Sequence, residues 1–165
     1  MKWIACFIFL FANVCFASRI IPMRWVSCNG HQGQVIGKVI ADDTMYGLLL
    51  TPHLYGLPSG IHGIHVHVMP SCSNYARAAG GHLDPVHTGL HRGPYNGGGH
   101  LGDLPVLIVD KSGRATLPIL APRLKLSLVE GHSLVINGGS DNYAENVGKQ
   151  PGSNVRIACG LIPWY

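Results

Sequence analysis

Histidine is unusually frequent in this sequence. The 165-residue chain has ten histidines against eight Asp and Glu residues, and seven of the ten lie between residues 62 and 100. Imidazole is the commonest protein ligand for metals at neutral pH, so this clustering indicates metal chemistry. The sequence contains no Gly-x-Ser-x-Gly nucleophile elbow, so hydrolysis by an activated serine fits it poorly.

Two of these histidines alternate with apolar residues. His65 and His67 stand at i and i+2, so on a strand they share one face, roughly 7 Å apart. Ile64, Val66 and Val68 face the other way and can fill a core. We therefore expect the histidine pair to project from the outside of a sheet, where a loop could cover it.

A second group of ligand-type residues lies further along the chain, among glycines. Its spacing is His-x8-His-x8-His-x2-Asp, and its members are His82, His91, His100 and Asp103. Three imidazoles and one carboxylate suit a closed, four-coordinate zinc site. Imidazole clusters equally suit copper, with the geometry deciding between the two metals.

The segments around these residues have the pattern of short strands. Apolar and β-branched runs predict strands at 34–41, 46–51, 61–68, 104–109, 114–120, 133–136 and 155–162. The pair 104–120 has the form of a hairpin around Asp110–Gly113. No window keeps a helical period over three turns, so we expect little helix. About eight short strands in one domain indicate an all-β antiparallel sandwich or barrel, and the two unpatterned stretches, 69–103 and 138–154, are expected to be functional loops.

Composition and the N-terminus limit the classes of protein further. A hydrophobic share of 47% with 12% charged residues excludes a disordered chain, and a net charge of +4 without a basic block does not favour nucleic-acid binding. Lys2 and the apolar run 4–16, closed by Ala17, predict a secretory signal at 1–17. That run of about 14 residues is short for a bilayer span of ~20. We expect a mature domain at 18–165 that is periplasmic or secreted and has no membrane segment.

Three cysteines remain after removal of that signal: Cys28, Cys72 and Cys159. An odd number in an oxidising compartment suggests one disulfide and one spare thiol. The count does not identify the pair. Cys28 lies in a polar stretch with the look of a hairpin tip, where it could stay a thiol or pair with another molecule.

Six motifs spread along the chain carry a resemblance to one known family. They are GIHVH (63–67), PSC (70–72), GGHLDP (80–85), GHLGDLP (99–105), APRL (121–124) and RIACG (156–160). Together they resemble the copper/zinc superoxide dismutase family, most of all its bacterial exported branch, over residues 35–162. The resemblance implies an eight-stranded antiparallel Greek-key β-sandwich or barrel with a metal-binding loop and an electrostatic loop.

The resemblance also implies a role for each matching residue. Copper would be bound by His65 and His67, and zinc by His91, His100 and Asp103, with His82 bridging the two metals. Asp141 would be an outer carboxylate that connects His65 to His91, since such contacts orient metal-ligating imidazoles.

Four further residues receive roles in the same way. Arg156 would lie beside copper and attract superoxide, and Cys72 and Cys159 would form the disulfide, which leaves Cys28 spare. His62 matches a structural histidine of the family. His87 does not match the motif and is expected to be solvated.

The sequence departs from the family at the fourth copper ligand. The family has a histidine four residues before the outer aspartate, and this chain has Asn137 there. His132 is five residues away and is a poor substitute. An amide oxygen is a harder and weaker donor for copper than imidazole. We therefore expect intact zinc binding, weakened copper binding and lowered or lost turnover.

The expected activity is that of an exported superoxide dismutase, an oxidoreductase that converts superoxide to oxygen and hydrogen peroxide by cycling between Cu(II) and Cu(I). The alternatives are a non-catalytic zinc-binding relative and a copper-binding or buffering protein. The stretch between Cys72 and His82 is shorter than in many bacterial relatives, and the second loop lacks their glycine run. Lys149 in that loop could still help to attract superoxide. The family includes both monomers and homodimers.

Overall fold

The protein is described here from a computed structural model, which covers residues 18–28, 33–144 and 155–164. The expected signal at 1–17 and Lys149 lie outside these residues. Within the covered ranges, no helix is long and apolar enough to cross a membrane. The strands are β1 (Arg19–Trp25), β2 (Val35–Thr44), β3 (Gly47–Leu54), β4 (Gly60–His62), β5 (Ile64–His67), β6 (Leu107–Val109), β7 (Ile119–Ala121), β8 (Ser133–Asn137) and β9 (Arg156–Leu161), with a short helix α1 (Leu126–Val129) and a 3-10 turn η1 (Arg77–Ala79).

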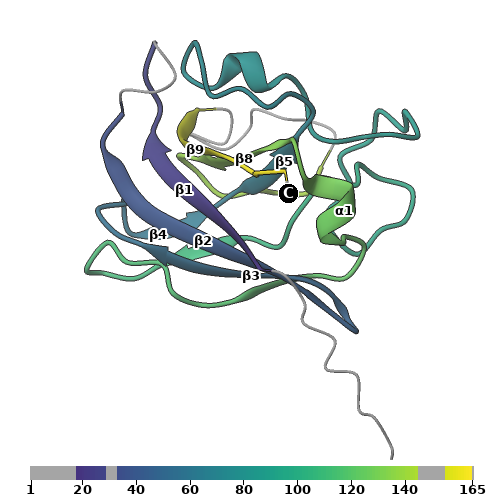
Figure 1. Cartoon of the computed structure of the whole chain (residues 1–165), viewed down its shortest axis with the longest axis horizontal. Coiled ribbons are helices and arrows are strands. Elements are labelled where there is room, and N and C mark those ends of the chain that lie inside the picture. Colours follow the sequence, from purple (N-terminus) through teal and green to yellow (C-terminus); the bar gives the residue numbers. More distant parts are fainter. Residues whose placement is uncertain (1–17, 29–32, 145–154, 165) are drawn as a thin grey trace, which may run out of the picture.

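Seven of these strands form one curled antiparallel sheet in the order β5-β8-β9-β1-β2-β3-β7, and β4 pairs with β6 (Figure 1). Neighbours that are distant in sequence, such as β9 and β1, are typical of Greek-key connections. The expected all-β fold with almost no helix is confirmed. One predicted strand, 61–68, divides at Gly63, because β4 pairs with β6 whereas β5 pairs with β8.

Two expectations about individual strands need correction. β1 was not expected, yet it pairs with both β2 and β9 and buries Ile21 and Met23 completely. The prediction of a hairpin at 104–120 is wrong, because its two strands do not pair with each other. Its turn forms, with the Gly113 amide donating to the Asp110 carbonyl at 3.0 Å. The chain then crosses to β3, where Ala115 bonds Leu54, so β6 and β7 pair with different strands.

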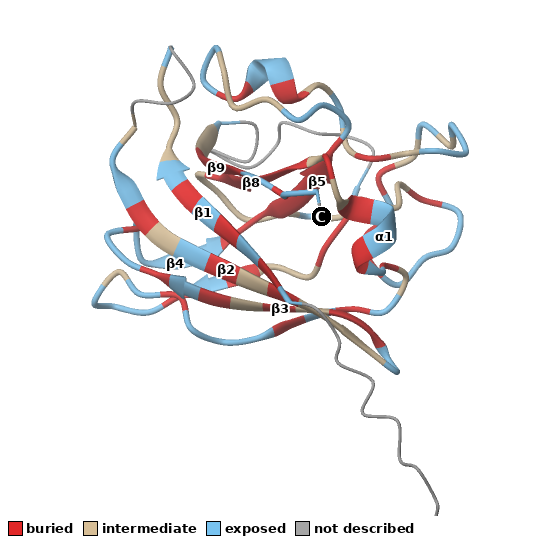
Figure 2. Ribbon diagram, in the orientation of Figure 1, coloured by how far each residue is buried: buried red, intermediate tan, exposed pale blue. Residues whose placement is uncertain are grey.

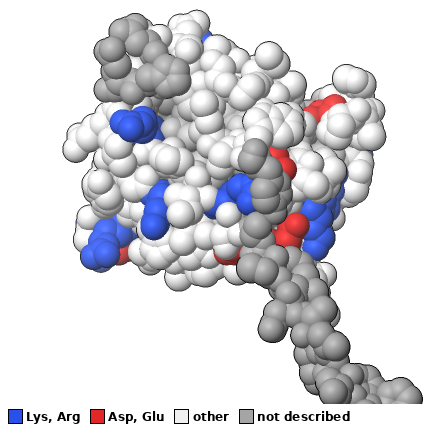
Figure 3. All heavy atoms as spheres, viewed as in Figure 1, with Lys and Arg blue, Asp and Glu red and all other residues white. Residues whose placement is uncertain are grey.

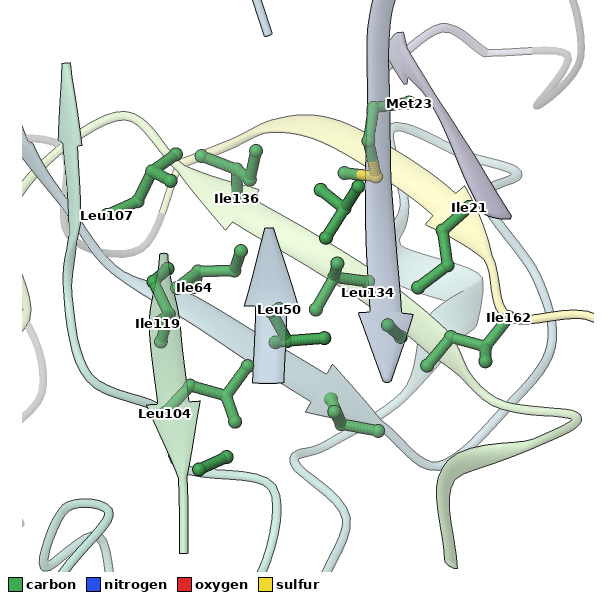
Figure 4. Packing of buried hydrophobic residues seen from close by; sticks show 14 of the residues in the cluster. Ile21, Met23, Leu50, Ile64, Leu104, Leu107, Ile119, Leu134, Ile136 and Ile162 are labelled. Carbon is green, nitrogen blue, oxygen red and sulfur yellow. The ribbon is translucent and has the colours of Figure 1, made fainter. Parts of the chain in front are cut away.

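The core lies inside the curled sheet. Buried and exposed residues alternate along β1, so one face of this strand packs on the core and the other faces solvent (Figure 2). The aliphatic side chains of the core come from several strands and lie together, including Leu50 of β3, Ile64 of β5 and Ile136 of β8 (Figure 4). Burying each such side chain stabilises the fold by about 2 kcal/mol. β5 and β8 are therefore firmly held on their inner faces, which gives the side chains on their outer faces a rigid base.

Candidate metal centre

The outer face of β5 carries His65 and His67, and both are almost completely buried. The predicted loop covers them. The Val66 amide donates to the Gly102 carbonyl (3.0 Å), the Leu83 amide donates to the Val66 carbonyl (2.8 Å), and the Gly102 amide donates to the Leu83 carbonyl (2.8 Å). A Cβ on Gly102 would lie 2.2 Å from the Val66 oxygen, so only glycine allows this close approach. The backbone thus holds the loop directly against the histidine strand.

The loop histidines converge on a single carboxylate oxygen. His82 Nδ1 and His91 Nδ1 each lie 2.9 Å from Asp103 Oδ1, and His100 Nδ1 lies 3.4 Å from it. Asp103 is buried, and the ligand atoms of all four residues lie within 4.8 Å of one another. Three imidazole nitrogens and one carboxylate around a common point match the donor set of a closed zinc site.

A second set of donors adjoins the first. His65 Nδ1 and His67 Nε2 are buried and have no hydrogen-bond partner among the described residues. The opposite nitrogen of each ring is engaged: His65 Nε2 lies 2.5 Å from Asp141 Oδ2, and His67 Nδ1 lies 3.0 Å from the Gly80 carbonyl oxygen. Each opposite nitrogen faces an acceptor, so the buried nitrogens keep their lone pairs available for a metal. His65, His67 and His82 form a second group able to hold an ion.

Asp141 connects the two groups. Its Oδ2 lies 2.5 Å from His65 Nε2 and its Oδ1 lies 2.7 Å from His91 Nε2. The Tyr143 amide also donates to Oδ1 (3.0 Å). One carboxylate thus fixes the orientation of an imidazole in each group, which is the arrangement that the resemblance implies for Asp141.

The two groups differ in their protonation. Burial, then the charges of His82 and Arg156, lowers the pKa of His67 to about 2, and burial together with His65 lowers that of His82 to about 4. Burial alone would lower the pKa of His91, but hydrogen bonds and charges from Asp103 and Asp141 together raise it to about 9. Near neutral pH, His67 and His82 are therefore neutral ligands, whereas a metal at the Asp103 group must displace a proton from His91.

The pKa values of the two aspartates shift in the opposite direction to burial. Burial would raise them, but hydrogen bonds from the surrounding histidines hold the pKa of Asp103 and of Asp141 well below the ordinary aspartate range. Both are carboxylates under all physiological conditions. The centre therefore carries two fixed negative charges that attract cations.

The donors open into a hollow of about 300 Å³. Its lining comprises His65, His67, Gly81, His82, His91, His100, Asn137, Asp141, Asn142 and Arg156. Asn137 is the last residue of β8 and is 9% exposed, and its backbone N–H donates to the Gly63 carbonyl (2.8 Å). His132 does not line this hollow. Its Nδ1 lies 2.8 Å from the Val68 carbonyl oxygen, so it takes no part as a substitute donor.

Arg156 closes one side of the hollow. Its Nη2 donates to the Gly80 carbonyl at 2.7 Å, and its Nη1 donates to the Ala76 carbonyl. The Cys72–Cys159 disulfide, with a Cα–Cα distance of 5.7 Å, ties the same loop to β9. This disulfide confirms the expected pairing. Cys28 is exposed and takes no part in that bond.

His62 and His87 lie apart from the ligand groups. His62 is buried, with its two ring nitrogens 2.8 Å from the Asn137 and Pro58 carbonyl oxygens. This is a structural role that joins β4 to the end of β8. His87 is exposed and belongs to none of the ligand groups found among the described residues.

Sequence reasoning missed Arg123 as a support of the centre. Its Nη1 donates to the His100 carbonyl (3.1 Å) and its Nη2 donates to the Gly99 carbonyl (3.0 Å), so it fixes the backbone of one ligand. The APRL motif contains this arginine, but nothing in the sequence indicates which backbone it contacts.

Comparisons with known proteins identify the family. A family model described as copper/zinc superoxide dismutase (SODC) matches residues 33–162. The chain belongs to the copper/zinc superoxide dismutase family. It is 54% identical over 139 residues to superoxide dismutase (Cu-Zn) 1 of Salmonella typhimurium, a match that covers 79% of this chain and 78% of that protein.

Solved structures give the same result. The structure titled Cu/Zn superoxide dismutase from Brucella abortus has a TM-score of 0.80 at 35% identity and covers 88% of this chain and 99% of its own. That of the monomeric copper, zinc superoxide dismutase from Salmonella enterica has a TM-score of 0.75 at 46% identity, with the same coverage. The expected family, fold and class of enzyme, an oxidoreductase acting on superoxide, are confirmed. The family's metals are copper and zinc, and the His and Asp groups of this chain can hold them.

Proposed function

We propose that this protein is an exported superoxide dismutase with a complete zinc site and a weakened copper site. The observation that carries the proposal is the sharing of His82 by two adjacent donor groups. In this assignment His82, His91, His100 and Asp103 would hold zinc, and His65, His67 and His82 would hold copper. Two superoxide anions and two protons would give one oxygen and one hydrogen peroxide.

Copper, when bound, supplies the one-electron chemistry of this reaction. The chain supplies the positioning. Arg156 is held by two carbonyl oxygens, so its positive charge is fixed at the wall of the hollow before an anion arrives. A preorganised charge attracts and orients a small anion without any cost of rearrangement. Asp141 keeps the donor nitrogen of His65 turned into the hollow.

Asn137 is the proposed cause of weak copper binding. It lines the hollow together with His65, His67 and Arg156, at the position that the family motif gives to a fourth imidazole. Its amide offers copper only a neutral oxygen, a poorer ligand than imidazole for either copper oxidation state. Copper would therefore depend on His65, His67 and His82.

Export is proposed from the N-terminal segment. A signal at 1–17 would leave the domain at 18–165 in the periplasm or outside the cell, where the Cys72–Cys159 disulfide is stable. Such a product would carry no membrane segment. A relative of 46% identity is described as monomeric, which favours a monomer over a homodimer.

The function is tested by loading the purified protein with both metals and measuring metal content and superoxide decay. We expect one tightly held zinc, loosely held copper and activity that requires added copper. His67→Ala should remove copper and activity but keep zinc. Arg156→Ala should keep both metals and lower the rate about tenfold or more, because steering is lost.

His87→Ala is the matched control, since this imidazole is exposed and outside the donor groups. It should leave metal content and rate unchanged. Activity that survives His67→Ala would refute the copper assignment.

Asn137 also favours a second candidate, a non-catalytic zinc protein. In that case zinc would raise the melting temperature, but no copper loading would give superoxide decay above that of free copper. Copper that exchanges readily without turnover would instead indicate a buffering role.

A further inference from the structure

A second hollow adjoins the metal centre and has no role in the proposed reaction. It measures about 550 Å³ and is lined by Tyr75, Arg77, Val155 and Arg156. Arg156 lines both hollows, so this arginine forms the partition between them. The second hollow therefore presents two guanidinium groups, only one of which serves the metal side.

The backbone that brings Arg77 to this hollow is strained. Asn74, Tyr75 and Ala76 have φ values of 51°, 55° and 59°, a run of three residues other than glycine in the left-handed region. Each such residue costs roughly 1–2 kcal/mol. Strain of this kind persists only where the surroundings enforce it, and it gathers at functional sites.

Contacts from two parts of the chain, residues 27–28 and Arg156, enforce this turn. The backbone N–H of Asn74 donates to the Cys28 carbonyl (3.1 Å), and that of Tyr75 donates to the Ser27 carbonyl (3.0 Å). Arg156 Nη1 donates to the Ala76 carbonyl. The short stretch between Cys72 and His82 thus turns sharply, and the turn leads directly into Arg77 at the start of η1.

The charges at this hollow are not balanced. Arg77 is exposed, and its side chain forms no hydrogen bond or ion pair with the described residues. None of the described residues that line the hollow is acidic. Burial, followed by the charge of Arg77, lowers the pKa of Arg156, as expected for two like charges in proximity.

We propose that Arg77 and Arg156 form a binding site for a small oxyanion of the phosphate class, separate from the metal hollow. An anion between the two guanidinium groups relieves their repulsion, and the planar fork of Arg77 suits two oxygens of one ligand. Nη1 and Nη2 of Arg156 already donate to carbonyl oxygens, so Arg156 contributes mainly charge from its fixed position. The hollow is larger than superoxide needs, which favours a tetrahedral oxyanion.

The test is calorimetric titration of inorganic phosphate into zinc-loaded, copper-free protein in a buffer of constant ionic strength. This measurement does not depend on dismutase activity. We expect saturable 1:1 binding, weakened about tenfold by Arg77→Gln because one charge-assisted contact pair is lost. Arg77→Lys should weaken binding by an intermediate factor, because it keeps the charge but loses the fork.

Arg114→Gln is the matched control. Arg114 is exposed, follows the 110–113 turn and lines neither hollow, so its substitution makes the same change in net charge away from both sites. It should alter phosphate affinity less than twofold, and acetate should bind the wild type more weakly than phosphate. Melting temperatures close to the wild-type value would show that each variant folds.

Three results would overturn the proposal. The first is the absence of saturable phosphate binding. The second is equal weakening by Arg77→Gln and Arg114→Gln, which would show a general effect of net charge. The third is binding lost in Arg156→Gln but kept within twofold in Arg77→Gln, which would place the anion in the metal hollow.

Discussion

The zinc-side and copper-side groups of this protein are neighbours, but they are built differently. All four zinc-side donors come from one loop, in which three histidines surround the buried carboxylate of Asp103. The copper-side donors His65 and His67 stand on β5, and Asn137 faces them from the end of β8. The first group is thus complete within one loop, whereas the second depends on the pairing of two strands.

The charges also differ between the two sides. Asp103 belongs to the zinc side alone, and Asp141 bonds one histidine of each side. Arg156 lies at the other end, where it lines the hollow beside His67. The zinc side therefore combines its imidazoles with negative charge, which favours tight binding of a cation. The copper side combines neutral donors with a cationic wall, which suits a site that must also admit an anion.

The largest effect is expected from removing the central carboxylate. Asp103→Asn should weaken zinc binding by more than about a hundredfold, since changes to outer contacts alone already cost 10- to 100-fold. Zinc competition with a chromophoric chelator measures this. Asp84→Asn in the same loop is the control, because its carboxylate accepts from the Gly89 amide (2.8 Å) and joins no donor group found in the described chain. Similar zinc affinities in the two variants would contradict the zinc assignment.

Asp141→Asn tests the connection between the sides. This carboxylate orients His65 and His91, so its loss should weaken the binding of both metals by about 10- to 100-fold. The affinities of the variant for zinc and for copper should be measured separately. A change confined to one metal would show that the two sides are independent.

A smaller difference between the two sides is expected in how their metal affinities change with pH. Zinc must displace the His91 proton, so its affinity should rise about tenfold per pH unit up to about pH 9 and then level off. His67 and His82, with pKa values of about 2 and 4, should add no dependence above pH 5. Zinc and copper titrations between pH 6 and 9 measure this, and a flat zinc profile would contradict it.

The same shift predicts how stability changes in the metal-free protein. The pKa of His91 is raised above the ordinary histidine value of 6.5, so its contribution to folding stability is complete below pH 6.5 and is lost as the pH rises through about 9. The melting temperature of the metal-free protein should therefore fall over this range. The zinc-loaded protein should not show the same fall.

The ligand residues were predictable because their spacing is local. The His-x8-His-x8-His-x2-Asp run and the His65–His67 alternation are both visible in short stretches of sequence. In the structure, the residues of each pattern come together in a group able to hold a metal. The all-β class followed from the same kind of pattern. The sharing of His82 and the bridging by Asp141 came only from resemblance to the family, because they join residues far apart in the sequence.

Other features depend on tertiary contacts and were not predictable. β1 forms because it can pair with both β2 and β9. The 104–120 hairpin fails because Ala115 bonds β3 instead of continuing beside β6. Arg123 and Arg77 owe their places to backbone geometry that no residue pattern encodes.

The most direct test of the account is to restore an imidazole at the end of β8 and measure both metal affinities in one competition experiment. Asn137→His should raise copper affinity by at least about tenfold, since imidazole replaces a weak oxygen donor, while zinc affinity stays within about twofold. Asn96→His, at an exposed position of the zinc loop, should change neither. If the wild type already holds copper as tightly as Asn137→His, the claim of a weakened copper site is wrong.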